Sequence, residues 1–255
     1  MDNEGESMQK PSLPVNEPAR LAALRAYRIL DTPSEHAFDD LAYLASQICG
    51  APMALVSFVD ADRQWWKARI GMPDEGTPRD ESFCGHAILK PHEVLVVPDA
   101  ARDARFADNP LVIGPLRVRF YAGAPIATSD GDALGTVCVL DRQPRTFTRA
   151  QEESLRAIAR RAVSELELRR TIHDLEAMLD ELRARDGLSR DPPARPPSSW
   201  GKGEATEGTV SLLESPIGPT GGYAVQERVM ESRVLEIMRR LQLLQKPAAE
   251  AAKTQ

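Results

Sequence analysis

The stretch LGTVCVLDRQPRTFT, residues 134–148, contains a strand, a turn and the start of a helix. Residues 134–140 are almost all apolar or β-branched, which is typical of a buried strand. Thr148 is followed three residues later by Gln151, a spacing that predicts a capping box at a helix N-terminus. From there the chain runs without glycine or proline to about Asp186, so we predict one long helix.

Further strands are predicted upstream of this stretch. Residues 52–59 (PMALVSFV) are nearly continuous in apolar character, as in a strand that is covered on both faces. The SDGD sequence at 129–132 has the chemistry of a turn between two strands. The remaining strand-like segments are residues 64–70, 94–97 and 119–127.

Two helices are predicted before the first strand. One begins at Asn16. The other begins after Thr32, which can cap it, with Pro33 in the first helical position and Glu35 reaching back to the cap nitrogen, and Gly50 ends it. An antiparallel sheet with its bracketing helices gathered on one face satisfies this order of elements, so the predicted fold class is α+β.

The chain divides by composition into a compact domain and several appendages. In the second half of the long helix, leucine and isoleucine recur in steps of four and three, which predicts a short coiled coil and a parallel homodimer. This seam consists of Leu168, Ile172, Leu175, Leu179 and Leu182. The predicted parts are a disordered N-terminus (1–15), the domain (16–168), a helical coiled-coil extension (169–190), a flexible linker (191–222) and an amphipathic helix (223–246).

The composition argues against several functional classes. The net charge of −6 is unlike that of proteins that bind nucleic acid through a basic face. No apolar run is long enough to span a bilayer and the N-terminus is acidic and polar, so we expect no membrane association and a cytoplasmic location. Cys49, Cys84 and Cys138 form no CxxC pair and no disulfide pattern, so we expect free thiols.

Several blocks of the chain match a known family. They are EPARLAALRAYRILDTPSEHAFDDLA, ALVSFVDADRQWWKARIG, PRDESFCGHAIL, VVPDAARDARFADNPLV, RFYAGAPI and LGTVCVLDRQPRTFT. Through them, residues 17–168 resemble the bacterial GAF domains of histidine kinases and diguanylate cyclases. The resemblance implies a ligand pocket on the sheet face opposite the terminal helices, and signalling through those helices. Residues 187–255 are too few for a kinase or cyclase domain, so a kinase or cyclase is expected as a signalling partner.

Long connections at 71–93 and 99–117 are left to cover the face opposite the helices. Loops pack less densely than helices, so we expect a cavity of at least roughly 300 Å³ there. Adjacent strand residues point to opposite faces, so Phe120 should face the helices and Tyr121, whose phenol needs a polar partner, the cavity. The predicted ligand-binding residues are Phe83, Cys84, His86, Arg105, Asn109 and Tyr121.

The cysteines and the adjacent Trp65 and Trp66 allow further interpretations. Cys84 and His86 are two ligands at most, which do not close a zinc site, and their flanking residues do not match a bilin-attachment motif. A thiol enzyme resembling free methionine sulfoxide reductase needs cysteines near one another, whereas Cys138 alternates within a strand and is expected to pack as a small hydrophobe. Trp65 and Trp66 are expected to face opposite ways, and one of them can floor a pocket.

The sequence therefore leads to a ranked set of functions. The first is a sensor or regulatory module that binds an unidentified small molecule and transmits through its C-terminal helix. The alternative is a protein-interaction adaptor whose pocket is filled by its own side chains. A thiol-based redox enzyme comes third. We expect no catalytic residue and no metal, and the cofactor stays unassigned.

Overall fold

The computed structural model describes residues 8–72 and 76–186. Its regular elements are α1 (Glu17–Ala26), α2 (His36–Cys49), β1 (Met53–Val59), β2 (Arg63–Ile70), β3 (Thr77–Pro78), η1 (Arg79–Glu81), α3 (Phe83–Ala87), β4 (Leu95–Val97), η2 (Ala100–Arg102), α4 (Pro110–Ile113), β5 (Phe120–Ala127), β6 (Ala133–Asp141) and α5 (Arg149–Asp186). The strands pair antiparallel in a six-stranded sheet of order β3-β2-β1-β6-β5-β4. This confirms the predicted α+β class.

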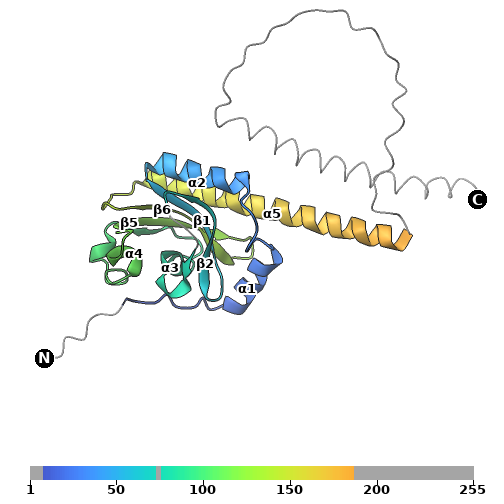
Figure 1. Cartoon of the computed structure of the whole chain (residues 1–255), viewed down its shortest axis with the longest axis horizontal. Helices are drawn as coiled ribbons and strands as arrows, with labels where there is room; N and C mark the ends of the chain where they lie inside the picture. Colours follow the sequence, from blue (N-terminus) through green and yellow to red (C-terminus); the bar gives the residue numbers. More distant parts are fainter. Residues whose placement is uncertain (1–7, 73–75, 187–255) are drawn as a thin grey trace, which may run out of the picture. The chain divides into compact units, whose positions relative to one another are not determined.

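One face of the sheet is covered by α2 and the first part of α5, which lie side by side (Figure 1). We call this the helix face. Its core is apolar and rich in alanine, and small side chains let helices approach a sheet closely. The strand residues include Ala54, Val56, Phe58, Ala122, Val137 and Val139, and the helix residues include Phe38, Leu41, Ala45, Leu155, Ala159 and Ala162.

The opposite face, which we call the loop face, is covered by α3, α4 and the segments around them (Figure 1). Its core includes Met53, Leu55, Phe83, Cys84, Phe106, Val112, Tyr121, Cys138 and Leu140. Phe120 belongs to the helix-face core and Tyr121 to the loop-face core, so the predicted orientations are confirmed. The same holds for the tryptophan pair: Trp65 packs on the helix-face core and Trp66 on the loop-face core.

The two predicted helix starts differ in outcome. The capping box at α5 is confirmed: the Thr148 backbone N–H donates to Gln151 Oε1 at 3.0 Å, and the Gln151 N–H to Thr148 Oγ1 at 3.2 Å. The predicted start of α2 after Thr32 is wrong, because α2 begins at His36 with Glu35 as its N-cap residue. Glu35 holds the N-cap position but makes no capping hydrogen bond with its side chain. The side chains of Thr32 and Glu35 both accept hydrogen bonds from Lys67 of β2 instead.

The N-terminal segment, expected to be disordered over 1–15, is described from Met8 onward and contacts the domain. The Gln9 carbonyl oxygen lies 3.0 Å from His86 Nε2, and Lys10 pairs with Asp80 at 2.6 Å. The expectation of disorder is therefore not met for residues 8–15. The predicted linker (191–222) and amphipathic helix (223–246) lie outside the described residues.

The chain divides into two compact units between Thr171 and Ile172, so α5 begins in the first unit and continues into the second. Within the predicted seam, Leu168 is 41% exposed, while Ile172 and Leu179 are buried. The coiled coil itself stays a prediction. Across residues 8–72 and 76–186, no helix combines the length and the apolar character that a membrane span requires.

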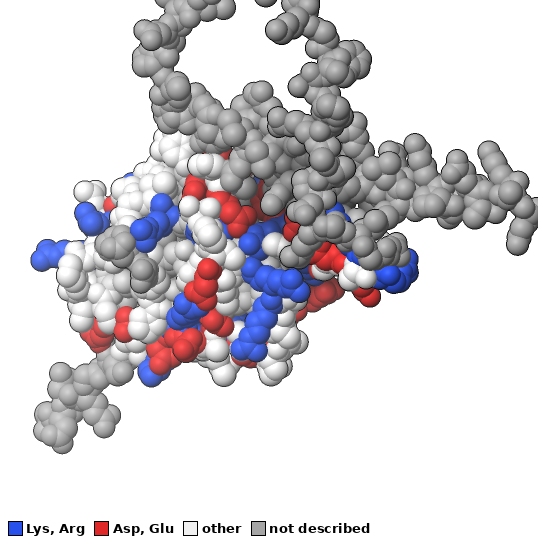
Figure 2. All heavy atoms as spheres, turned by 45° about the vertical axis from the view of Figure 1, so that its right-hand side comes forward, with Lys and Arg blue, Asp and Glu red and all other residues white. Residues whose placement is uncertain are grey.

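Charged residues of both signs are interspersed on the surface that Figure 2 shows. Many charged residues of the domain form ion pairs with residues three or four positions away in the sequence, such as Arg149 with Glu153 at 2.9 Å and Lys90 with Glu93 at 2.8 Å. Exposed pairs of this kind contribute at most about 1 kcal/mol each. The surface charges therefore contribute little to the stability of the fold, which rests on the two cores.

Candidate functional site

A small cavity lies in the loop-face core. Its volume is about 10 Å³, which is room for about one water molecule. It is lined by Leu55, Gln64, Trp66, Met72, Thr77, Phe83, Cys84, Leu111, Tyr121, Cys138 and Leu140. The expectation of a cavity above roughly 300 Å³ on this face is therefore wrong for the described residues.

Aromatic side chains fill the space that a ligand would need. The Phe83 ring stacks on Phe106 with 4.1 Å between centroids and on Tyr121 with 5.1 Å. All three rings are almost fully buried. Such stacks contribute about 0.5–1.5 kcal/mol each beyond the burial of their area. A molecule of metabolite size enters this face only if the stack opens.

Next to the cavity, the sulfur of Cys84 is surrounded by polar groups. It accepts hydrogen bonds from the hydroxyls of Thr136 at 3.0 Å, Ser57 at 3.4 Å and Tyr121 at 3.4 Å. The Sγ of Cys138 lies 3.8 Å from the Sγ of Cys84. All five residues are at most 1% exposed. Cys138 is thus buried in the loop-face core next to Cys84, a proximity that the sequence did not indicate, while Cys49 lies in the helix-face core.

These contacts move the pKa values of the two thiols in opposite directions. Burial raises the pKa of Cys84, but hydrogen bonds from Cys138, Ser57, Thr136 and Tyr121 outweigh burial, so its pKa is lowered overall. Burial, together with the adjacent Cys84 sulfur, raises the pKa of Cys138. The three hydroxyl donors therefore favour negative charge on Cys84 over negative charge on Cys138.

The sheet register places these groups together. Ser57 of β1 lies directly opposite Thr136 of β6, and Cys138 lies opposite Gly123 of β5. A Cβ atom on Gly123 would lie 2.1 Å from the Tyr121 hydroxyl oxygen, so only glycine leaves room for the phenol. The site thus depends on side-chain alternation along three neighbouring strands.

A short helix brings Cys84 onto this surface. The backbone N–H of Gly85 donates to the hydroxyl of Ser82 at 2.9 Å, which makes Ser82 the N-cap of α3. Because FCGHA is helical, residues two apart point about 200° apart around the axis. Cys84 therefore faces the sheet, while His86 faces the N-terminal segment and the edge of Phe106.

Two buried polar atoms at the cavity have no hydrogen-bond partner. They are the Trp66 indole Nε1 and the Thr77 Oγ1. An unpaired buried donor costs about 1–3 kcal/mol, so such groups usually have a partner in a folded protein. A water-sized polar molecule in the cavity is the species that fits both groups.

The six residues predicted to bind a ligand fall into two groups. Phe83, Cys84 and Tyr121 line the cavity. The other three have roles in the local structure. Arg105 is paired with Asp103 at 2.7 Å. Asn109 caps α4 by accepting from the Leu111 N–H at 2.8 Å.

His86 belongs to the second group, because its Nε2 lies 3.0 Å from the Gln9 carbonyl oxygen. Burial, the largest effect, lowers the pKa of His86. Within the described part of the chain, no group of His, Cys, Asp and Glu side chains has the composition of a metal site.

A second polar cluster lies at the edge of the helix face. Lys67 of β2, with a fully buried side chain, donates to Glu35 Oε1 at 2.6 Å and to the Pro33 carbonyl at 2.6 Å. Arg169 of α5 donates to both oxygens of Glu35, at 3.0 and 3.3 Å. Burial lowers the pKa of Lys67, while Glu35 acts against this by stabilising the ammonium. Glu35 therefore joins the sheet to α5, and we call these three residues the Glu35 junction.

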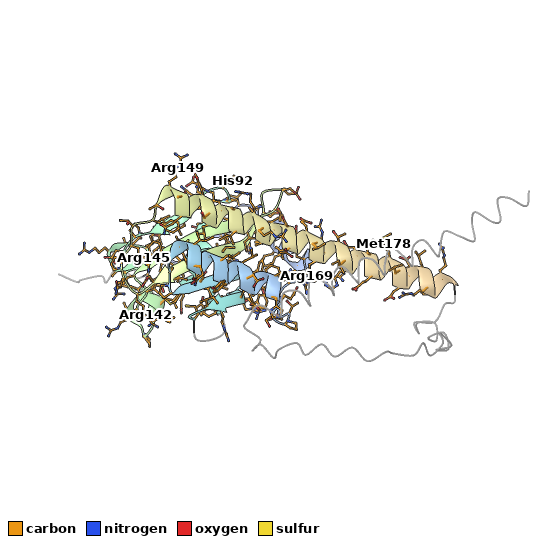
Figure 3. All side chains as sticks on the ribbon, turned by 90° about the horizontal axis from the view of Figure 1, so that it is seen from above. His92, Arg142, Arg145, Arg149, Arg169 and Met178 are labelled. Carbon is orange, nitrogen blue, oxygen red and sulfur yellow. The ribbon has the colours of Figure 1, made fainter. Side chains whose placement is uncertain are left out.

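Tyr27 adds a further contact between the N-terminal region and α5. Its hydroxyl donates to Glu167 Oε1 at 2.5 Å, and burial, with Glu167 adding to it, raises the pKa of Tyr27 to about 12. At the other end of α2, Arg145 donates to Asp141 and to the Cys49 carbonyl. Figure 3 shows Arg145 and Arg169 at opposite ends of α2. Gln151 of α5 also donates to the Cys49 carbonyl, at 3.2 Å, so α5 is fixed to the domain at both ends of α2.

Comparisons with known proteins agree with this architecture. The model of the GAF domain family matches residues 33–166. The cyclic di-GMP phosphodiesterase PA2567 of Pseudomonas aeruginosa is 44% identical over 138 residues, which are 54% of this chain and 23% of that protein. This chain thus spans less than a quarter of the length of that relative.

Solved structures give the same kind of match at lower identity. The GAF domain of an Acinetobacter phosphoenolpyruvate-protein phosphotransferase is 17% identical, with a TM-score of 0.45 over 61% of this chain and 95% of that one. The PixJ GAF domain of Thermosynechococcus elongatus is 15% identical, with a TM-score of 0.46 over 64% of this chain and 96% of that one. The family match covers more than half of the chain and residues in every layer of the fold. The chain therefore belongs to the GAF domain family, as its sequence blocks predicted.

Proposed function

We propose that this protein is a signal-transduction module in which the loop face receives the signal and α5 transmits it. The observation that carries this proposal is the Glu35 junction. Glu35 binds Lys67 of the sheet and Arg169 of α5 at the same time. We infer that a displacement of β2 changes this ion pair of α5 directly, and that a second arrangement of the junction would carry the coupling.

The junction lies one residue from the cavity. Trp66 lines the cavity and pairs with Ser57 of β1, and the next residue along β2 is Lys67. The register of β1 and β2 shifts at this point, so that Val56 is opposite Ala68 and Lys67 has no residue opposite it. Bulges of this kind redirect side chains and occur often next to functional sites. Movement of Trp66 on one face is thus passed to Lys67 on the other.

The small cavity favours the adaptor among the functions predicted from the sequence. With room for about one water molecule, the cavity in the loop-face core does not hold a nucleotide or a pigment in the described conformation. We propose that the module acts on a protein partner through α5 and has no turnover of its own. The relative named a cyclic di-GMP phosphodiesterase suggests an enzyme of second-messenger metabolism, such as a cyclase, or else a kinase as that partner.

Hydrogen exchange tests the coupling. Glu35→Gln removes the charge that holds Lys67 and Arg169, so exchange of the backbone amides at 164–171 of α5 should become faster. The matched control is Glu153→Gln, which removes an exposed ion pair with Arg149 on the same helix and should leave these amides unchanged. Unchanged exchange in Glu35→Gln would show that the junction does not hold α5 and would remove the proposal.

We also propose a homodimer through the seam of α5. Leu175→Asp places a charge in the seam and should convert the dimer to a monomer in light scattering, because burying an unpaired charge costs several kcal/mol. Ala177→Asp is the control, because Ala177 is exposed and lies on the outer side of the heptad. An unchanged mass for both variants would show that the seam is not the interface.

Native mass spectrometry of the full chain separates the adaptor from the small-molecule sensor. The closed cavity predicts the mass of the polypeptide without a bound metabolite. A co-purifying small molecule of metabolite size would instead support the sensor, and would require the Phe83 stack to open around it.

A further inference from the structure

The buried cysteine pair has a geometry that the proposed function does not use. We propose that Cys84 and Cys138 form an oxidant-sensitive dithiol site, in which Cys84 reacts with a small hydroperoxide and Cys138 then closes a disulfide. The site is built from four elements, because Cys84 comes from α3, Cys138 from β6 and the hydroxyl donors from β1, β5 and β6.

The distance between the sulfurs suits this reaction. They are 3.8 Å apart, close to van der Waals contact, and a disulfide requires about 2.05 Å. Rotation about the two Cα–Cβ bonds and a small shift of α3 supply the difference. Cys49 serves as an internal control for oxidation, because it lies in the helix-face core, away from the other two thiols.

The cavity supplies a place for the oxidant. It is lined by both Cys84 and Cys138 and has room for about one water molecule, so hydrogen peroxide, with its two oxygens, enters with a small shift of the lining side chains, and larger oxidants are excluded. The two unpaired polar atoms, Trp66 Nε1 and Thr77 Oγ1, are an indole donor and a hydroxyl. A peroxide oxygen can accept from the indole N–H, and a peroxide O–H can donate to the hydroxyl oxygen.

The surroundings divide the roles of the two thiols. The hydroxyls of Ser57, Thr136 and Tyr121 all donate to Cys84, which stabilises a thiolate there in the way that an oxyanion is stabilised by aligned donors. The thiolate is the nucleophilic form of cysteine. Cys138, whose pKa is raised, keeps its proton and is the thiol that resolves the oxidised Cys84.

The reaction balances in two steps. In the first, the Cys84 thiolate attacks one peroxide oxygen, an S–O bond forms and the O–O bond breaks. The leaving hydroxide takes up the proton that the Cys84 thiol has lost and departs as water. In the second, the Cys138 sulfur attacks the Cys84 sulfenic acid, an S–S bond forms, the S–O bond breaks, and hydroxide leaves with the Cys138 proton as water. Two thiols are oxidised by two electrons and one peroxide is reduced.

The role of this site as a signal input rests on the proposed function. The disulfide draws α3 toward β6, and Ser57, which binds Cys84, lies opposite Trp66 in the sheet. Oxidation therefore perturbs the strand residue next to Lys67 of the Glu35 junction. The chemistry of the dithiol can be tested apart from its effect on α5, so the two can fail separately.

The experiment treats the full chain with hydrogen peroxide under native conditions, then denatures it in N-ethylmaleimide and maps the peptides by mass spectrometry. We expect a Cys84–Cys138 disulfide with the loss of two hydrogen atoms, and an alkylated Cys49. In Cys138→Ser, Cys84 should accumulate as a sulfenic acid that dimedone traps. The proposal would be overturned if Cys84 and Cys138 of the native chain are still alkylated after peroxide treatment, while the same treatment oxidises them in the denatured chain.

Variants of Thr136 show whether the donors matter. Thr136→Val removes the closest donor and should slow oxidation about tenfold, because a hydrogen bond to a charged group shifts a pKa by about one unit or more. Thr136→Ser keeps the hydroxyl and should react at nearly the wild-type rate. Equal rates in the two variants would show that Cys84 is not activated by its hydroxyl shell, which contradicts the proposed mechanism.

Hydrogen exchange on the same oxidised sample tests the link to α5. Faster or slower exchange at residues 164–171 after disulfide formation supports the site as an input. A disulfide that forms without any change in α5 leaves the dithiol chemistry established and overturns its role in signalling.

Discussion

On β1, Ala54, Val56 and Phe58 face α2 and α5, while Leu55 and Ser57 on the same strand face the loops. The neighbouring strand β6 repeats this division. Its Val137 and Val139 belong to the helix-face core, while Thr136 and Cys138 contact Cys84 on the loop face. One set of strands therefore carries a purely apolar surface on one side and hydroxyl and thiol groups on the other.

This difference separates stability from chemistry within one sheet. Packing apolar groups against helices stabilises a fold without requiring polar partners. Burying hydroxyls and thiols costs free energy unless each finds a partner, and the loop face meets that cost with a shared acceptor at Cys84. Substitutions on the loop face can therefore change its chemistry while the helix face keeps the fold and α5 in place.

The largest expected effect comes from the same substitution on the two faces. Phe58→Ala on the helix face should lower the free energy of unfolding by about 3–5 kcal/mol, because rigid helices cannot close the cavity. Phe83→Ala on the loop face removes an equally buried ring, but its neighbours lie in short elements that can relax. Its cost should fall below that of Phe58→Ala in urea unfolding. A larger cost at Phe83 would mean that the loop face is the principal core.

Glu17 joins the two layers and gives a pH-dependent effect. It binds Arg20 of its own helix at 2.7 Å and Arg79 of η1 at 2.5 Å. Burial raises the pKa of Glu17, but Arg20 and Arg79 outweigh it and lower the pKa from 4.5 to about 2. The folded pKa is depressed, so this stabilisation is complete above pH 4.5 and is lost as the pH falls toward 2.

Glu17→Gln should therefore destabilise the protein by roughly 3 kcal/mol at neutral pH, with the difference from wild type shrinking below pH 4.5. Urea unfolding at several pH values from neutral to acidic measures it. Glu93→Gln, which removes an exposed pair with Lys90, is the control and should show no such slope. A constant difference at all pH values would mean that the loss is one of packing.

Gly123→Ala tests the fit of the phenol on the loop face. The new Cβ would lie 2.1 Å from the Tyr121 hydroxyl and 2.6 Å from its ring carbon Cζ, so the ring must move. Overpacking of this kind costs about 1–3 kcal/mol. In a Tyr121→Ala background the same substitution should cost much less, because the ring is gone. Equal costs in both backgrounds would show that the strain lies in the backbone.

The sequence was sufficient to predict the sheet and the faces of its residues, because alternation and capping are local signals. The orientations of Phe120 and Tyr121 follow from two-residue periodicity, and the start of α5 follows from Thr148 and Gln151. The start of α2 was not predictable in this way. The capping side chains at Thr32 and Glu35 look available in the sequence, but Lys67, more than 30 residues away, binds both.

The site was predictable only in part, for a similar reason. Residues 83–89 are too short to distinguish a strand from a helix, and the helix turns His86 away from the side that Cys84 faces. The Ser57 and Thr136 hydroxyls meet Cys84 through strand register, which no local pattern shows. Alternation places Cys138 and Thr136 on one face of their strand, but only the pairing of β5 with β6 shows that this is the face of Tyr121.

The smallest expected effect on stability comes from Tyr121→Phe. The phenol is fully buried and donates to Cys84 at 3.4 Å, a long bond to a weak acceptor, so its loss should cost no more than about 1 kcal/mol. The same change removes one of the three hydroxyl donors to Cys84 and should slow peroxide oxidation of that thiol. The slowing should be smaller than in Thr136→Val, because the hydrogen bond from Thr136 to Cys84 is shorter, at 3.0 Å.

The control is Tyr27→Phe, which removes a phenol donor to Glu167 at the margin of the helix face and should leave Cys84 reactivity unchanged. If Tyr121→Phe slows oxidation and barely changes the free energy of unfolding, the role of the Tyr121 hydroxyl is to stabilise the Cys84 thiolate. If it destabilises the fold by several kcal/mol with no change in oxidation, the loop face is simply a second core, and the division between the two faces does not hold.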